Sequence, residues 1–196
     1  MKRDFDFHSK ISKADIYELP VKKFEGKIFV LDSFEKLVKV KDKFKNIEFI
    51  GFDTETRPSF KKGKLYNTSL VQIATSDEAF LFRINITGIP DLLINIMENS
   101  DIIKVGVALK HDLVSLQKIK AFKPGGFIDL QQYVEQFGIK DKGLRKLAAN
   151  ILGLRLVKGQ QTSNWESKTL KQPQLEYAAT DAWVCYEIYK KLSRII

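Results

Sequence analysis

The sequence predicts a mixed α/β sheet with helices packed on it. Strand patterns come first, helical and strand patterns then alternate, and a run of helices ends the chain. At 196 residues the chain is long enough for one domain with a sizeable core. Hydrophobic residues make up 44% and charged residues 29%, a balance typical of soluble globular proteins. We expect an irregular N-terminal arm over residues 1–27 and a single domain over residues 28–196.

The expected strands lie mainly in the first half of the chain. "KIFVLDS" predicts a short strand, with Asp32 or Ser33 as the cap of a helix over residues 34–46. "IEFIGFDTE" is apolar on both faces, the pattern of a central strand. "TSLVQIATS" and "EAFLFRI", separated by Ser76 and Asp77, predict a hairpin in the same sheet.

Helical spacing dominates the second half. "GIPDLLINIMENS" predicts a helix with Pro90 and Asp91 in its first turn, "IIKVGVAL" a dense strand, and "HDLVSLQKI" a further helix. "FIDLQQYVEQFG" and "KGLRKLAANILG" predict two helical segments that each end at a glycine. "TLKQPQLEYAATDAWVCYEIYKKLSRI" predicts a long final helix that begins near Pro173.

Charge and composition narrow the functional classes. A net charge of +9 favours polyanionic partners, although most of the lysines are also explained as solvated surface residues. No apolar run approaches the roughly 18 to 20 residues of a membrane helix, and the first residues have no signal-peptide apolar segment. The single cysteine, Cys185, cannot form an internal disulfide. We therefore expect a cytoplasmic protein with no membrane association.

Two carboxylates, Asp53 and Glu55, end the expected central strand in "FIGFDTETRP". Alternate residues of a strand share one face, so these side chains lie about 6 to 7 Å apart along the chain. Keeping carboxylates together away from bulk water costs on the order of several kcal/mol per charge unless a cation or hydrogen-bond donors compensate. Taken alone, the pair favours the simpler interpretation, a strand that ends near Gly51 or Phe52 with both acids solvated.

Further acidic positions follow along the chain. Asp112 begins a helix after a dense strand, where an acid stabilises the helix N-terminus by about 0.3 to 1 kcal/mol. The carboxyl ends of strands in open α/β sheets also bind ligands, which makes Asp112 a candidate site residue. Tyr177 and Asp181 in "YAATD" project from one face of the last helix. In isolation this pair favours a core tyrosine beside an exposed aspartate.

Together, these motifs resemble the DEDD exonucleases, specifically the tyrosine-type branch that includes ribonuclease D and Werner-type exonuclease domains. "FDTE" matches motif one, and Tyr177 with Asp181 matches motif three. "TSLVQIA" is similar to the family's second strand, and Ser163 with Trp165 is similar to its Ser-x-Trp segment. The resemblance covers about residues 28 to 192.

The resemblance implies a ribonuclease H-like fold and a metal-dependent 3'-5' exonuclease that releases 5'-mononucleotides from the 3' end of DNA or RNA. The implied cofactors are two divalent cations, Mg²⁺ or Mn²⁺, which prefer oxygen ligands. The implied metal ligands are Asp53, Glu55, Asp112 and Asp181. Tyr177 completes the implied catalytic set by orienting the attacking water.

Motif two departs from the family pattern, because this chain has Ala108 and His111 where the family often has asparagine and an aromatic residue. The resemblance points to four substrate-binding candidates: Thr54, His111, Lys158 and Trp165. Thr54 is expected to approach the terminal nucleotide mainly through its backbone. For the other three a purely structural role stays open. His111 and Lys158 would then be ordinary exposed residues, and Trp165 would pack a helix junction. Asp129 is expected to be a helix cap and not a fifth ligand.

A second functional class remains compatible with the departure in motif two. A catalytically weak or inactive nucleic-acid-binding module would keep the fold without turnover. The four intact acids argue against it, because a pure binder gains nothing from negative charge that faces phosphate.

Overall fold

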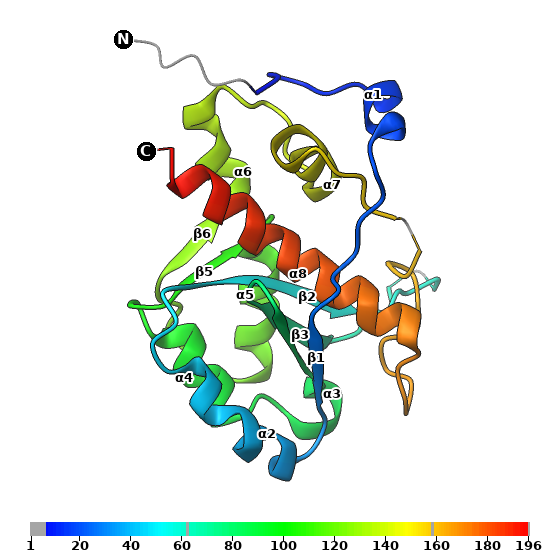
Figure 1. The fold of residues 1–196 in the computed structure, drawn as a ribbon. Helices are drawn as coiled ribbons and strands as arrows, with labels where there is room; N and C mark the ends of the chain where they lie inside the picture. Colours follow the sequence, from blue (N-terminus) through cyan, green and yellow to red (C-terminus); the bar gives the residue numbers. More distant parts are fainter. Residues whose placement is uncertain (1–6, 62, 158, 196) are drawn as a thin grey trace.

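The computed structural model describes residues 7–61, 63–157 and 159–195. Its centre is a six-stranded sheet of order β1-β4-β3-β2-β5-β6 (Figure 1). The strands are β1 Lys27–Leu31, β2 Phe49–Thr56, β3 Thr68–Ala74, β4 Glu78–Phe82, β5 Ile103–Gly106 and β6 Phe127–Asp129. Strand β3 pairs antiparallel with both β2 and β4, and the other pairings are parallel. The expected mixed sheet, its central strand β2 and the β3–β4 hairpin are confirmed.

Helices cover both faces of this sheet. The α-helices are α1 Lys13–Glu18, α2 Phe34–Val40, α3 Ile84–Thr87, α4 Asp91–Glu98, α5 Leu109–Ile119, α6 Leu130–Tyr133, α7 Leu144–Leu147 and α8 Gln172–Ser193. Within the described residues, α2 and α6 are extended by the 3-10 helices η1 Lys41–Phe44 and η2 Val134–Phe137, and α7 is extended by the π-helix η3 Ala148–Leu152. Figure 1 shows α8 crossing the sheet, with α2 and α4 at the opposite end of the molecule from α6 and α7.

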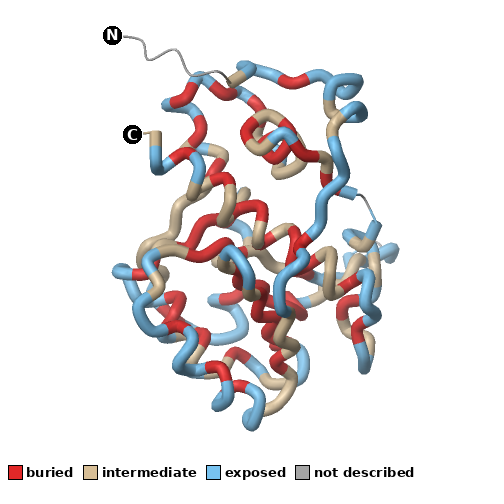
Figure 2. The backbone as a smooth tube through the Cα atoms, viewed as in Figure 1, coloured by how far each residue is buried: buried red, intermediate tan, exposed pale blue. Residues whose placement is uncertain are grey.

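The alternation of β2 divides the core into two layers. Ile50 and Phe52 are fully buried on the face that packs against α4 and α5. On the other face of the sheet, alanines of α8 pack on Ala74 and Ala79. Figure 2 shows buried backbone through the centre of the molecule and exposed backbone around its rim. A strand buried on both sides explains why the sequence of β2 is apolar at consecutive positions.

Gly51 determines how closely α8 approaches β2. A Cβ atom at this position would lie 1.8 Å from the backbone oxygen of Ala182 in α8. No side chain fits in that space, so only glycine permits this helix to rest directly on the strand. The close approach brings residue 181 of α8 beside residues 53 and 55 of β2.

Four sequence-based expectations need correction. The N-terminal arm is not wholly irregular, because α1 forms there with a capping box between Ser12 and Asp15. The helix expected over residues 34–46 changes to a 3-10 turn after Val40, although Ser33 caps it as expected. Pro90 precedes α4 as its extended N-cap and does not belong to the first turn. The segment from Phe127 begins as strand β6, because its backbone pairs with β5 at the sheet edge.

Candidate active site

Three carboxylates converge where β2 meets α8. Asp53 and Glu55 project from one face of β2, and Asp181 projects towards them from α8. Ligand oxygens of these three residues all lie within 4.8 Å of one another. The acids converge because Asp53 and Glu55 share one face of β2, and because Gly51 lets α8 approach that face closely.

Asp112 approaches the cluster from the other layer of the fold. Thr54 alternates to the face opposite Asp53 and donates a hydrogen bond from its hydroxyl to Asp112 Oδ1 at 2.8 Å. This contact explains why Asp112 lies outside the tightest group of three acids. Its charge still acts on the site, since it contributes to raising the pKa of both Asp53 and Glu55. Burial raises the pKa of Asp112 itself, against the hydrogen bond from Thr54.

Asp129 holds the start of α5, on which Asp112 lies. Its carboxylate accepts hydrogen bonds from the backbone N–H groups of Ala108 at 3.1 Å and Leu109 at 3.0 Å. It also caps α6 by accepting from Gln131 N at 2.9 Å. The expectation that Asp129 is a helix cap is confirmed, and a single carboxylate serves two helices. Ala108, the N-cap of α5, has a left-handed φ of 59°.

The cluster carries more negative charge than its surroundings neutralise. Burial, followed by the charges of Asp181 and Asp112, raises the pKa of Asp53 well above its ordinary value. Burial and the neighbouring acids raise the pKa of Glu55 to about 10. Burial raises the pKa of Asp181 to about 6, opposed by a hydrogen bond from Tyr177 and by the charge of Arg145. In the protein alone Glu55 therefore retains a proton at neutral pH that a cation would displace, whereas Asp181 is largely ionised.

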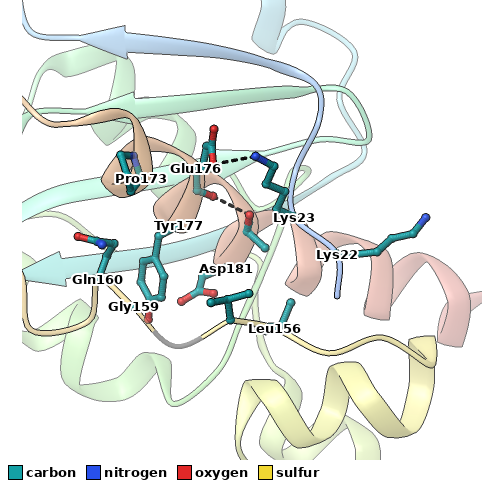
Figure 3. Close-up of a pocket in the computed structure, with 11 residues that line it drawn as sticks. Lys22, Lys23, Leu156, Gly159, Gln160, Pro173, Glu176, Tyr177 and Asp181 are labelled. Atoms are coloured by element: carbon teal, nitrogen blue, oxygen red, sulfur yellow. Dashed lines mark hydrogen bonds and ion pairs between the residues drawn. The ribbon is translucent and has the colours of Figure 1, made fainter. Parts of the chain in front are cut away.

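Tyr177 lies one helical turn before Asp181 and points to the same side of α8 (Figure 3). Burial raises its pKa above the ordinary value of 10.0, and the charge of Asp181 adds to that effect. The phenol therefore stays neutral and can donate or accept a hydrogen bond at physiological pH. Trp165 supports its ring, with the two ring centroids 6.2 Å apart.

The remaining substrate-binding candidates have different outcomes. Trp165 is 0% exposed and packs among Leu70, Leu81 and Leu170, which agrees with the interpretation of a packing residue and not with stacking on a substrate base. Its segment is tied to α8, because Gln174 Nε2 donates to Ser163 Oγ at 2.9 Å. His111 is exposed beside Asp112. Lys158 lies outside the described residues.

Two residues at the site were missed by the sequence analysis. Gln72 of β3 is fully buried and donates from Nε2 to Asp53 Oδ2 at 3.4 Å. Arg145 of α7 lines the same cavity as Asp53, Glu55 and Asp181. A glutamine inside the apolar run "TSLVQIA" was a visible signal, because a buried amide requires a partner. Nothing local distinguishes Arg145 from the other basic residues of a surface helix.

A second cavity shares Tyr177 and Asp181 with the acidic cavity. Its walls include Leu156 and Pro173 together with Tyr177 and Asp181 (Figure 3). At its rim, Lys23 of the N-terminal arm forms an ion pair with Glu176 at 3.0 Å. The backbone N–H of Phe24 donates to Thr180 Oγ1 at 3.0 Å, next to Asp181. The arm therefore contacts the helical turn that carries the third acid.

Across the described ranges, no helix combines the length and apolar character that crossing a bilayer requires.

Comparisons with known proteins agree with this geometry. The family model for 3'-5' exonucleases matches residues 28–196. A "3'-5' exonuclease" of Arabidopsis thaliana is 32% identical over 93% of this chain and 69% of its own length. Ribonuclease D of Xanthomonas oryzae is 32% identical over 74% of this chain, which spans 40% of that relative. The crystal structure of the Aedes aegypti Nibbler EXO domain superposes with a TM-score of 0.77 at 26% identity, covering 89% of this chain and 94% of that one.

These matches confirm the expected ribonuclease H-like fold and the resemblance on which it was based. They also confirm the expected enzyme class, since this is a family of hydrolases that cleave phosphodiesters. The matched region contains β2, α5 and α8, and so all the acids of the cluster. The chain belongs to the 3'-5' exonuclease family.

Proposed function

We propose that this protein is a metal-dependent 3'-5' exonuclease that hydrolyses the terminal phosphodiester of DNA or RNA and releases 5'-mononucleotides. The observation that carries the proposal is the convergence of Asp53, Glu55 and Asp181, with Asp112 next to them. The enzyme class of the Arabidopsis thaliana and ribonuclease D relatives supports the same activity. We further propose residues 28–196 as the exonuclease domain and residues 1–27 as an N-terminal arm.

The donor set fits hard divalent cations. All four acids offer oxygen ligands, and three of them have oxygens within 4.8 Å. Their raised pKa values indicate a site that lacks positive charge, which is what a bound cation would provide. Held by Asp53, Glu55, Asp112 and Asp181, two Mg²⁺ or Mn²⁺ ions would supply charge stabilisation and an activated water in phosphodiester hydrolysis.

The chain's own residues have separate tasks in this reaction. Tyr177 is neutral, so we assign it to orient the attacking water by hydrogen bonding and not to remove a proton from it. Arg145 lines the cavity with the acids and is placed to bind a substrate phosphate. Gln72 fixes the carboxylate of Asp53, and Thr54 fixes that of Asp112. These contacts hold the ligands in place before substrate arrives.

The alternative of a binding module without turnover has less support. Asp181 is largely ionised at neutral pH and repels phosphate, so a protein that only binds nucleic acid would be better served without this cluster. The cytoplasm remains our proposed compartment, because the single Cys185 is buried and unpaired, which suits reducing conditions.

Incubation with oligonucleotides labelled at the 5' end tests the proposal. Matched DNA and RNA strands are each combined with Mg²⁺ or Mn²⁺, and products are separated at single-nucleotide resolution. The proposal predicts a ladder that shortens from the 3' end, with 5'-mononucleotides in solution and no products when EDTA is present. Binding of the strands with no mononucleotide release in either metal would favour the inactive module.

A further inference from the structure

A basic and aromatic groove lies next to the acidic cavity, on the loop that connects β2 to β3. Most of its lining comes from this loop, namely Arg57, Phe60, Lys61, Lys64 and Tyr66. Asn164 lines the groove from a second segment of the chain. The groove adjoins the acidic cavity along both chain segments. Glu55 and Gln161 line the cavity, whereas Arg57 and Thr162 line the groove.

The charged side chains that line this groove are all positive. Among the described residues, its lining includes Arg57, Lys61 and Lys64 and no acidic side chain. Arg57 is committed to an ion pair with Glu166 at 3.0 Å. Within the described part of the chain, neither Lys61 nor Lys64 has an acidic partner at ion-pair distance. Two lysines are thus available to an anionic ligand, in a chain with a net charge of +9.

An exposed aromatic ring stands among these cations. The side chain of Phe60 is 86% exposed. Tyr66 is held differently, because the Arg57 guanidinium and the Lys64 ammonium lie 4.7 and 4.9 Å from its ring centroid. Phe60 is therefore the ring in this groove with its faces open to a ligand.

The loop that carries these side chains has its own internal order. The Ser59 hydroxyl donates to Lys61 O at 3.1 Å, and Lys64 N donates to the same oxygen at 3.2 Å. The ion pair between Arg57 and Glu166 ties the start of the loop to the segment that contains Trp165. The start of the loop is thus attached to the segment whose Trp165 packs against Tyr177.

We propose that this groove binds the single-stranded segment of nucleic acid that precedes the terminal nucleotide. A base stacks on Phe60, and backbone phosphates contact Lys61 and Lys64. Stacking on a side chain requires a base that is free of a duplex, which selects a single strand. The inference rests on the proposed function, since it describes how the same substrate reaches the acidic site.

The experiment compares a groove variant with a matched control. Phe60→Ala/Lys61→Ala removes the open ring and one available lysine. Phe34→Ala/Lys118→Ala makes the same two changes outside the groove, at a phenylalanine that is 80% exposed on α2 and an exposed lysine of α5. Affinity for a fluorescent single strand of about twelve nucleotides is measured by anisotropy in EDTA, where no hydrolysis occurs, and hydrolysis of a dinucleotide is measured with Mn²⁺.

The groove variant should bind the single strand about tenfold or more weakly than wild type, while the control should differ by less than about twofold. Hydrolysis of the dinucleotide, which has no strand to place in the groove, should be the same for both. Equal loss in the two variants, no loss in the groove variant, or an equal loss for a blunt duplex would overturn the inference. A wild-type protein that binds the strand yet hydrolyses no substrate would instead contradict the proposed function, which keeps the two failures distinct.

Discussion

Ala108 adopts a left-handed backbone conformation at the entry to α5, three residues after Val105 of the central sheet. A Cβ atom in that region costs roughly 1 to 2 kcal/mol. The two hydrogen bonds from Ala108 N and Leu109 N to Asp129 hold the strained turn in place. The strained turn lies at the start of the helix that carries Asp112 and orients it.

Ala108→Gly should stabilise the protein by about 1 kcal/mol, because glycine adopts a positive φ without the steric cost. The free energy of unfolding from denaturant titration measures this change. Ala121→Gly is the matched control: Ala121 is exposed, lies outside helices and strands and has no positive φ. That control should lose stability by about 0.4 to 1 kcal/mol, since only the entropy of the unfolded chain changes there. Destabilisation by both variants would contradict the assignment of strain at Ala108.

Tyr177→Phe keeps the ring that packs on Trp165 and removes the hydroxyl. If the hydroxyl orients the attacking water, kcat should fall by about 10²-fold with little change in KM. Steady-state kinetics on a single-stranded oligonucleotide separate the two constants. An unchanged kcat would mean that Tyr177 serves only the core.

At the scale of elements, the site depends on how closely α8 rests on β2. Gly51 is the contact point, because any Cβ there would overlap the backbone of Ala182. The helix also receives the N-terminal arm through Phe24 and Thr180. Asp181 is therefore positioned by packing on two sides of α8, and not by its own turn of helix alone.

Gly51→Ala should push α8 away from β2 and separate Asp181 from Asp53 and Glu55. We expect a loss of about 1 to 3 kcal/mol in the free energy of unfolding, as for other overpacked cores, together with a weakened response to Mn²⁺. Thermal melts with and without Mn²⁺ measure both effects. Gly143→Ala is the control, because a Cβ at Gly143 meets nothing within 4 Å and φ there is −86°. A Gly51→Ala protein with wild-type stability would show that α8 can move without cost.

Several elements were predictable because burial leaves a direct trace in the sequence. Strand β2 is apolar on both faces, since each face is covered. Helix α8 was identifiable because its apolar residues recur at helical spacing along 22 residues, in spite of polar residues between them. Strand β6 was not predictable, because it has three residues and exists through pairing with β5. The short helix α1 was missed, since its support is a local capping box and not an apolar face.

The site was predictable only in part, because several of its contacts join residues that are far apart in the sequence. Residue types and their order identified the acids, but no spacing indicates that Thr54 holds Asp112 on the opposite layer. The burial of Trp165 agrees with its interpretation as a packing residue, but the sequence alone did not exclude stacking on a base. Long-range contacts such as Gln72 with Asp53 come from strand pairing and appear only in three dimensions.

For the whole molecule, the metal-free acid cluster couples stability to pH. The folded pKa of Glu55 is about 10 against an ordinary value of 4.5, so the folded protein keeps a proton that the unfolded chain releases. Between pH 6 and 8 the free energy of unfolding should therefore fall as pH rises, by up to about 1.4 kcal/mol per pH unit for each retained proton. Lys104, whose pKa burial lowers to about 8, adds an opposite trend that begins near the upper end of this window.

Thermal or chemical unfolding in EDTA across this window measures the slope. Mn²⁺ should stabilise the protein more at pH 8 than at pH 6, because it competes with fewer protons. Glu55→Gln removes one titrating group and should flatten the slope in EDTA. Stability that rises with pH in the absence of metal would contradict the raised pKa values.

The most direct test of the central claim is the rate of 3'-terminal nucleotide release by wild type and by Asp53→Asn under saturating Mn²⁺. Asparagine keeps the shape of Asp53 and removes the charge that the account requires for the metal site. The account predicts a fall in turnover of at least ~10²-fold with single-strand affinity in EDTA retained. Wild-type turnover by Asp53→Asn would contradict the assignment of this cluster as the catalytic site.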